Sequence, residues 1–82
     1  GYSRRMPTPE KSPALKRFGA NVRALREKRD LSQEALAEIA DLDRTYIGGL
    51  ERGERNATLA SILRIAKALK TSASELCEGI DR

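Results

Sequence analysis

The sequence contains no histidine, no tryptophan and one cysteine, Cys77, among its 82 residues. One cysteine cannot form a disulfide within the chain, and without histidine it lacks the usual partners of a zinc site. Acid–base and nucleophilic catalysis also lack their usual side chains, because the sequence shows no cluster of metal ligands and no phosphate-binding loop. These absences argue against an enzyme and predict neither a cofactor nor a bound metal.

Long apolar runs are missing as well, since no segment approaches the roughly 18 consecutive apolar residues of a membrane-spanning helix. The first residues contain no apolar segment typical of a secretory signal peptide. We therefore expect a cytoplasmic protein without a membrane partner and without a small-molecule ligand. A chain of 82 residues makes one domain whose core is only marginally stable by itself, which favours a homodimer.

Positive charge is concentrated in the first part of the chain. Residues 1–30 hold nine Lys and Arg against three acidic residues, and the whole chain has a net charge of +4. Such an excess favours a polyanionic partner such as nucleic acid, although it is equally typical of a solvated surface. Residues 1–12 contain Pro7, Pro9 and no apolar periodicity, so we expect a flexible basic arm there. The folded domain is expected to span residues 13–82.

Five helices, and hence an all-α fold, are predicted from residue 13 onward. The first helix ends near Arg29, and its apolar residues recur on one face at helical spacing: Leu15, Phe18, Val22 and Leu25. A residue that favours helix N-caps precedes each of the other four helices: Ser32, Asp43, Thr58 and Ser72. No alternating pattern typical of a strand competes with these helices.

The fourth predicted helix has an apolar face wider than a small core requires. Its expected core stripe is Leu59, Ile62, Leu63, Ala66 and Leu69, with Ile65 on the flank. Together with apolar residues of the fifth helix, the flank suggests a self-complementary patch across a twofold axis. The predicted dimer-interface residues are Ile65, Leu69, Leu76, Cys77 and Ile80. The alternative is that these residues only extend the core.

A short turn around Asp41 separates the second and third predicted helices and forces them to cross steeply. Small side chains at the contact, Ala37 and Ala40, permit a close crossing. We expect a positive φ at Asp41, because aspartate tolerates this conformation better than most residues. The face of the third helix that points away from the core is then expected to be exposed: Arg44, Thr45, Gly48, Gly49 and Arg52.

Two segments resemble the lambda-repressor-like (Xre-type) helix-turn-helix family: residues 31–37 (Leu-Ser-Gln-Glu-Ala-Leu-Ala) and residues 46–53 (Tyr-Ile-Gly-Gly-Leu-Glu-Arg-Gly). Within that family, residues 42–47 and 51–56 resemble the controller proteins of restriction-modification systems. The resemblance implies a compact five-helix DNA-binding domain with the helix-turn-helix at helices two and three. It also implies a transcriptional regulator that binds double-stranded operator DNA, with a palindromic site for a homodimer. Three positions depart from the family pattern: Asp41 replaces glycine, Gly48 replaces serine and Ala57 replaces proline.

The candidate DNA-binding residues follow from this geometry and from the resemblance: Gln33, Arg44, Thr45, Tyr46, Gly49, Arg52, Arg55 and Asn56. The exposed side chains of the third helix would read bases, and Arg44 is the candidate for a paired contact to guanine. The family resemblance implies that Gln33 is an anchor on a phosphate or on a base edge. Arg52, Arg55 and Asn56 would contact phosphates, and the resemblance to controller proteins lets Arg55 reach bases as well. Gly49 would let the helix backbone approach the DNA.

Plainer interpretations remain open for several of these side chains. Tyr46 could instead cover the edge of the core, and Arg52 could pair with a neighbouring glutamate. Arg23 and Arg26 are expected to be solubilising surface residues. At the level of function, the alternative is an antitoxin-type protein that mainly binds a partner protein, although the short chain beyond the fifth helix offers little for such binding. Whether binding activates or represses transcription stays open.

Overall fold

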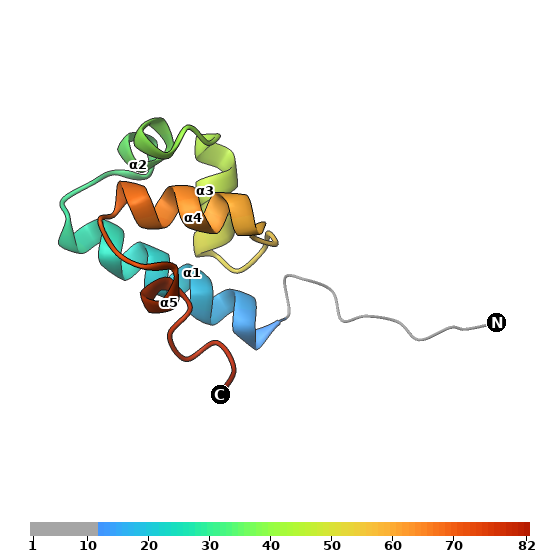
Figure 1. Ribbon diagram of the computed structural model, residues 1–82. Helices are drawn as coiled ribbons and strands as arrows, with labels where there is room; N and C mark the ends of the chain where they lie inside the picture. Colours follow the sequence, from blue (N-terminus) through green and yellow to red (C-terminus); the bar gives the residue numbers. More distant parts are fainter. Residues whose placement is uncertain (1–11) are drawn as a thin grey trace.

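A computed structural model describes residues 12–82, and in this range the chain is all-helical. The five helices are α1 (Pro13–Lys28), α2 (Gln33–Ala40), α3 (Arg44–Glu51), α4 (Leu59–Ala68) and α5 (Ala73–Leu76). Figure 1 shows α5 beside α1, and α3 contacts both α1 and α2. Among the described residues, no helix is long and apolar enough to cross a membrane.

The helix starts agree closely with the predicted caps. Each of the four expected N-cap side chains accepts a backbone N–H from the first turn of its helix: Ser32, Asp43, Thr58 and Ser72. Ser12 does the same for α1, since its hydroxyl accepts the N–H of Leu15 at 3.4 Å. Ser12 therefore belongs to the helix start, whereas the rest of the predicted arm lies outside the described residues.

The core is built from all five helices. Its buried apolar side chains are Phe18, Val22, Leu36, Ala37, Ala40, Ile47, Leu50, Ile65, Ala66, Leu69 and Leu76. Helical periodicity predicted the α1, α2 and α3 members of this set, but it also placed Ile39 of α2 on the apolar face, and Ile39 is 58% exposed. Asn21 of α1 connects this helix to the end of α5 and the residues after it. Its side-chain amide donates to the carbonyl oxygens of Leu76 at 2.8 Å and Glu78 at 2.9 Å.

The turn between α2 and α3 has the predicted geometry. Asp41 ends α2 in the left-handed conformation, with φ 59° and ψ 49°, and so it takes the place that glycine usually fills at a helix C-terminus. Its carbonyl oxygen accepts a hydrogen bond from the guanidinium of Arg64 at 3.3 Å. The departure from the family pattern at this position is therefore accommodated without a change in the turn.

One contact that the sequence pattern did not predict determines how α1 and α3 pack. A Cβ atom added to Gly19 would lie 2.1 Å from the carbonyl oxygen of Leu50 and 2.6 Å from that of Glu51. Glycine at position 19 thus lets α1 approach the backbone of the last turn of α3. Because backbone atoms are in contact, a larger side chain could be admitted only by moving one helix away from the other.

The predicted orientation of α4 is partly wrong. Ala66 and Leu69 are buried as expected, but Leu59 and Leu63, also expected in the core, are 71% and 53% exposed. Ile65, expected on the flank, is completely buried. The helix is rotated because Ser61 faces the core, where its hydroxyl is satisfied by Thr58 and Tyr46. Because serine is polar, the apolar pattern places Ser61 outside the core, whereas the structure buries it.

The predicted dimer interface is wrong for three of its five residues. Three of its members, Ile65, Leu69 and Leu76, have no exposed surface in the single chain and cannot contact a second copy. Helix α5 is also shorter than expected and ends at Leu76, so that Cys77 and Ile80 follow it. Both of these are half-buried against the core. For the three interior residues, the alternative of core extension is therefore correct.

Replacing Gly19 with alanine tests the α1–α3 contact. At an exposed helical position this change stabilises by up to about 1 kcal/mol, but here the new methyl group meets backbone oxygens. We expect Gly19→Ala to lower the free energy of unfolding by about 3 kcal/mol, measured by urea denaturation. Ala20→Gly, on the exposed neighbour, should cost only about 1 kcal/mol. A stabilised Gly19→Ala variant would contradict the close contact.

Candidate nucleic-acid interface

Helix α3 presents its first turn to solvent and buries its later part. Ile47 and Leu50 are in the core, whereas Arg44 and Thr45 are exposed. The carboxylate of Asp43 accepts the N–H of Thr45 at 2.8 Å and fixes the start of the helix. A helix N-terminus with exposed polar side chains and a buried opposite face is the arrangement that recognition helices use in the major groove.

The predicted exposure of Gly48 and Gly49 is wrong, since both are buried. Side chains from other positions cover them. An added Cβ on Gly48 would lie 3.1 Å from Nη1 of Arg52 and 3.5 Å from Oε1 of Gln33, and one on Gly49 would lie 2.4 Å from Cγ of Arg55. The two glycines therefore make room for the side chains of the neighbouring arginines, and the side chain of Arg55 covers Gly49.

A buried ion pair lies behind α3. The guanidinium of Arg26 donates to both carboxylate oxygens of Glu51, at 2.6 and 3.0 Å, and a third bond at 2.8 Å reaches the carbonyl oxygen of Leu31. The side chains of Arg26 and Glu51 are only 11% and 3% exposed. Hydrogen bonding to Glu51 raises the pKa of Arg26 above its ordinary value. The same carboxylate accepts the side-chain amide of Gln33 at 2.9 Å.

The prediction of Arg26 as a solubilising surface residue is therefore wrong, whereas Arg23 is exposed and pairs with Glu27. The sequence nevertheless indicates the ion pair of Arg26 with Glu51. Glu51 follows Ile47 by four residues and so lies on the buried face of α3, where a carboxylate needs a cationic partner. Arg26 stands in the same relation to Val22 on the buried face of α1. Two opposite charges on two core faces pointed to this pair.

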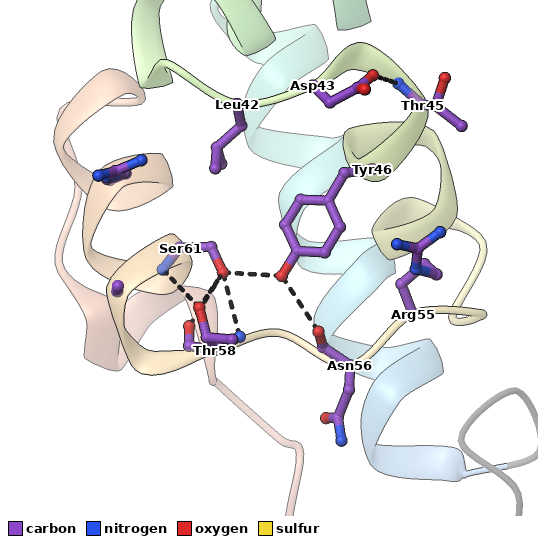
Figure 2. A pocket seen from close by; sticks show the side chains of 10 residues that line it. Leu42, Asp43, Thr45, Tyr46, Arg55, Asn56, Thr58 and Ser61 are labelled. Atoms are coloured by element: carbon purple, nitrogen blue, oxygen red, sulfur yellow. Dashed lines mark hydrogen bonds between the residues drawn. The ribbon is translucent and has the colours of Figure 1, made fainter.

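Tyr46 joins α3 to the loop that follows it, as Figure 2 shows. Its hydroxyl donates to the carbonyl oxygen of Asn56 at 3.1 Å and shares a hydrogen bond with the hydroxyl of Ser61 at 2.8 Å. The ring packs against the core, and the guanidinium of Arg55 lies 5.6 Å from its centroid. This arrangement supports the interpretation that Tyr46 covers the edge of the core, and a contact to DNA remains a prediction.

The predicted DNA-binding residues fall into three places. A hollow between α3, the following loop and the start of α4 is lined by Thr45, Tyr46, Arg55 and Asn56. The side chains of Gln33 and Arg52 both lie beside Gly48. Arg44 borders a second hollow against α2, beside Glu34 and Glu38. All three places adjoin α3, so the structure brings the candidates together around the recognition helix.

The exposed arginines at and after the end of α3 are only weakly held. Arg52 donates to Glu54 at 2.9 Å, but both side chains are more than half exposed, and such a surface pair contributes little to stability. Arg55 is exposed as well. Neither guanidinium is tied into the core, so both can exchange their present partners for phosphate oxygens at small cost.

Comparison with known proteins supports this geometry. A family model described as helix-turn-helix matches residues 22–76. The control protein C.SmaI of Serratia marcescens is 57% identical over 56 residues, which cover 68% of this chain and 67% of that protein. For the control protein C.MunI of a Mycoplasma species, the identity is 45% over 67 residues, or 80% and 90% of the two chains.

A solved structure gives the same result. The restriction-modification controller protein C.AhdI from Aeromonas hydrophila matches with a TM-score of 0.75 and 50% identity, covering 76% of this chain and 94% of that one. The resemblance first noted in residues 31–37 and 46–53 is thereby confirmed, together with the five-helix fold.

Removing one partner of the buried ion pair should destabilise the domain. Arg26→Met leaves the carboxylate of Glu51 desolvated and without its cation, and we expect a loss of about 3 kcal/mol in the free energy of unfolding. Arg23→Met, which breaks an exposed pair on the same helix, should change it by less than about 0.5 kcal/mol. Urea denaturation at neutral pH measures both.

A double variant completes this test. Arg26→Met combined with Glu51→Leu removes both charges and should recover most of the lost stability, because a buried ion pair and an apolar pair of similar size are often equivalent. If Arg26→Met is no more harmful than Arg23→Met, the pair is not buried in solution.

Proposed function

This chain belongs to the helix-turn-helix family of DNA-binding transcriptional regulators, and from that premise we propose that it controls a restriction-modification system by binding a palindromic operator as a homodimer. The observation that carries the proposal is the exposed first turn of α3, with Arg44 and Thr45 held in place by the cap at Asp43. Similarity to control proteins supports the choice of regulated genes. Operator binding places the protein in the cytoplasm, and a regulator of this family is not an enzyme.

The first turn of α3 enters the major groove in this proposal. Arg44 has the planar fork that pairs with the O6 and N7 atoms of guanine, and the hydroxyl and methyl groups of Thr45 suit either a base edge or a thymine methyl. Asp43 itself stays at the helix cap, where its carboxylate is engaged by the N–H of Thr45. Base reading is thus assigned to the exposed side chains at positions 44 and 45.

The DNA backbone is held from both sides of α3. The N-terminus of α2, with Gln33 as its first residue, offers backbone N–H groups and a side-chain amide to phosphate oxygens. Arg52, Arg55 and Asn56 contribute at the other end, where their side chains are exposed. Tyr46 acts mainly by holding the loop that carries Asn56, because its hydroxyl already bonds the backbone there.

A twofold dimer is proposed through the exposed apolar surface of α4. Leu59 and Leu63 lie one helical turn apart and are more than half exposed, an arrangement that is costly for a small domain unless a partner covers it. A second copy could present the same pair of side chains across a twofold axis. Such a dimer would set the two recognition helices about 34 to 36 Å apart, to match half-sites separated by one helical turn.

Truncation of Arg44 and of Arg52 should change DNA binding in different ways. Arg44→Ala should weaken operator binding by about 1 to 3 kcal/mol and relax preference at one base pair, whereas Arg52→Ala should weaken binding to all sequences alike. Selection from a random duplex pool, followed by titration of the consensus and of point-mutated duplexes, measures both effects. Arg23→Ala removes an equal charge from an exposed position on α1, where Arg23 pairs with Glu27, and is the matched control.

The same selection tests the function as a whole. A palindromic consensus enriched by the wild-type protein is the expected outcome. No enrichment over random DNA at moderate salt, from a protein shown to be folded, would overturn the proposal and favour a protein-binding role. An equal loss on every duplex with Arg44→Ala would place that residue among the phosphate contacts.

A charge at the α4 surface should separate the two copies. Leu63→Glu would force two carboxylates together across the proposed twofold axis and leave them desolvated, so we expect a monomer at concentrations where the wild type is a dimer. Sedimentation equilibrium measures the mass. Ile39→Glu, which changes another exposed apolar residue on α2, should leave the dimer intact. A dimeric Leu63→Glu protein would show that the interface lies elsewhere.

A further inference from the structure

The buried ion pair between Arg26 and Glu51 makes one further hydrogen bond, to the side chain of Gln33. A role in stability alone does not explain this bond. Glu51 ends α3, and its Oε1 atom accepts both Nη2 of Arg26 at 3.0 Å and the side-chain amide of Gln33 at 2.9 Å. Gln33 is the first residue of α2. One carboxylate thus connects α1, α3 and the side chain at the start of α2.

Stability alone does not require charges at this place. Burying the guanidinium and the carboxylate costs desolvation of both, and an apolar pair of similar volume usually stabilises a core at least as well. An apolar pair, however, offers no acceptor to the amide of Gln33. The feature that only the ion pair supplies is an oriented carboxylate oxygen beside the N-terminus of α2.

The geometry limits how the amide of Gln33 can lie. Its nitrogen is held by Glu51 at 2.9 Å, and its oxygen lies over Gly48, 3.5 Å from the position of an added Cβ. The amide group therefore lies between Glu51 and Gly48, with its nitrogen toward the end of α3. An amide nitrogen carries two hydrogens, and within residues 12–82 only Glu51 takes one from Gln33. The second remains available for a phosphate oxygen.

Arg26 also holds the backbone at this point. Its Nη1 atom donates to the carbonyl oxygen of Leu31 at 2.8 Å, directly before the cap residue Ser32. The backbone entering α2 and the first side chain of α2 are both tied to one guanidinium, the second of them through Glu51. A free glutamine side chain would have to lose rotamer freedom on binding, and this tether removes that cost in advance.

We infer that Arg26 and Glu51 are positioning residues that hold the amide of Gln33 ready to donate to a DNA phosphate. The inference rests on the proposed DNA-binding function and adds to it the origin of one backbone contact. Neither charged side chain touches DNA in this arrangement, since both are almost completely buried. They act through the side chain of Gln33, together with the backbone at Leu31 that Arg26 holds.

A double-mutant cycle on operator affinity tests the inference. In the wild-type background, Gln33→Ala should weaken binding about tenfold, the value of one hydrogen bond to a charged group. In the Arg26→Met, Glu51→Leu background, which keeps a packed core, binding should already be about tenfold weaker, and Gln33→Ala should add less than a twofold loss. Equal losses in both backgrounds would overturn the inference.

Gln33 also gives a direct spectroscopic test, because it is the only glutamine in the sequence. Its side-chain amide should give one NMR cross-peak pair with a hydrogen-bonded shift and slow exchange in the free wild-type protein. In Glu51→Met, which keeps Gln33 the only glutamine but removes the acceptor of its amide, this protection should fall. An unchanged signal would contradict the tether even if the double variant fails to fold.

Failure of the inference and failure of the proposed function are distinguishable. A wild-type protein that selects no DNA sequence removes the function, whatever the NMR signal shows. A protein that binds its operator equally well with glutamine or alanine at position 33 keeps the function and removes the inference.

Discussion

The contact between α1 and the last turn of α3 is the constraint on which the rest of the structure depends. It is made by backbone atoms, because Gly19 brings α1 against the carbonyl oxygens of Leu50 and Glu51. Arg26 lies about two turns further along α1 and from there reaches the carboxylate of Glu51. Since one end of α3 is held in this rigid way, its other end leaves the core in a defined direction, with Arg44 and Thr45 exposed.

Charge serves two separate purposes around this contact. The Arg26–Glu51 pair is buried and expensive to break, so it belongs to the frame that holds α2 against α3. The Arg52–Glu54 pair is exposed and weak, so Arg52 can leave its partner for a phosphate group. Arginine and glutamate therefore stabilise the scaffold in the buried pair, whereas in the exposed pair the arginine remains available for binding. The difference between the two pairs is their burial.

A small polar contact connects the proposed reading surface with the proposed dimer surface. Tyr46 of α3 and Ser61 of α4 share a hydrogen bond at 2.8 Å, and Ser61 is buried beside the apolar core. This bond turns Ser61 inward and so turns Leu59 and Leu63 toward solvent. In a twofold dimer formed through these leucines, the separation of the two recognition helices would follow from this one orientation, because α3 and α4 are joined at that point.

The sequence by itself determined the fold class, the four internal helix caps, the left-handed turn at Asp41 and the family, because these follow from local propensity and short motifs. Tertiary structure decided which face of α4 is buried, since Ser61 enters the core only when Tyr46 and Thr58 satisfy its hydroxyl. It also decided that Gly48 and Gly49 are covered and that Arg26 is buried. These features depend on partners distant in the chain, which the periodicity of one helix does not identify. For Arg26, only the comparison of α1 with α3, where Glu51 lies on the buried face, indicates the pair.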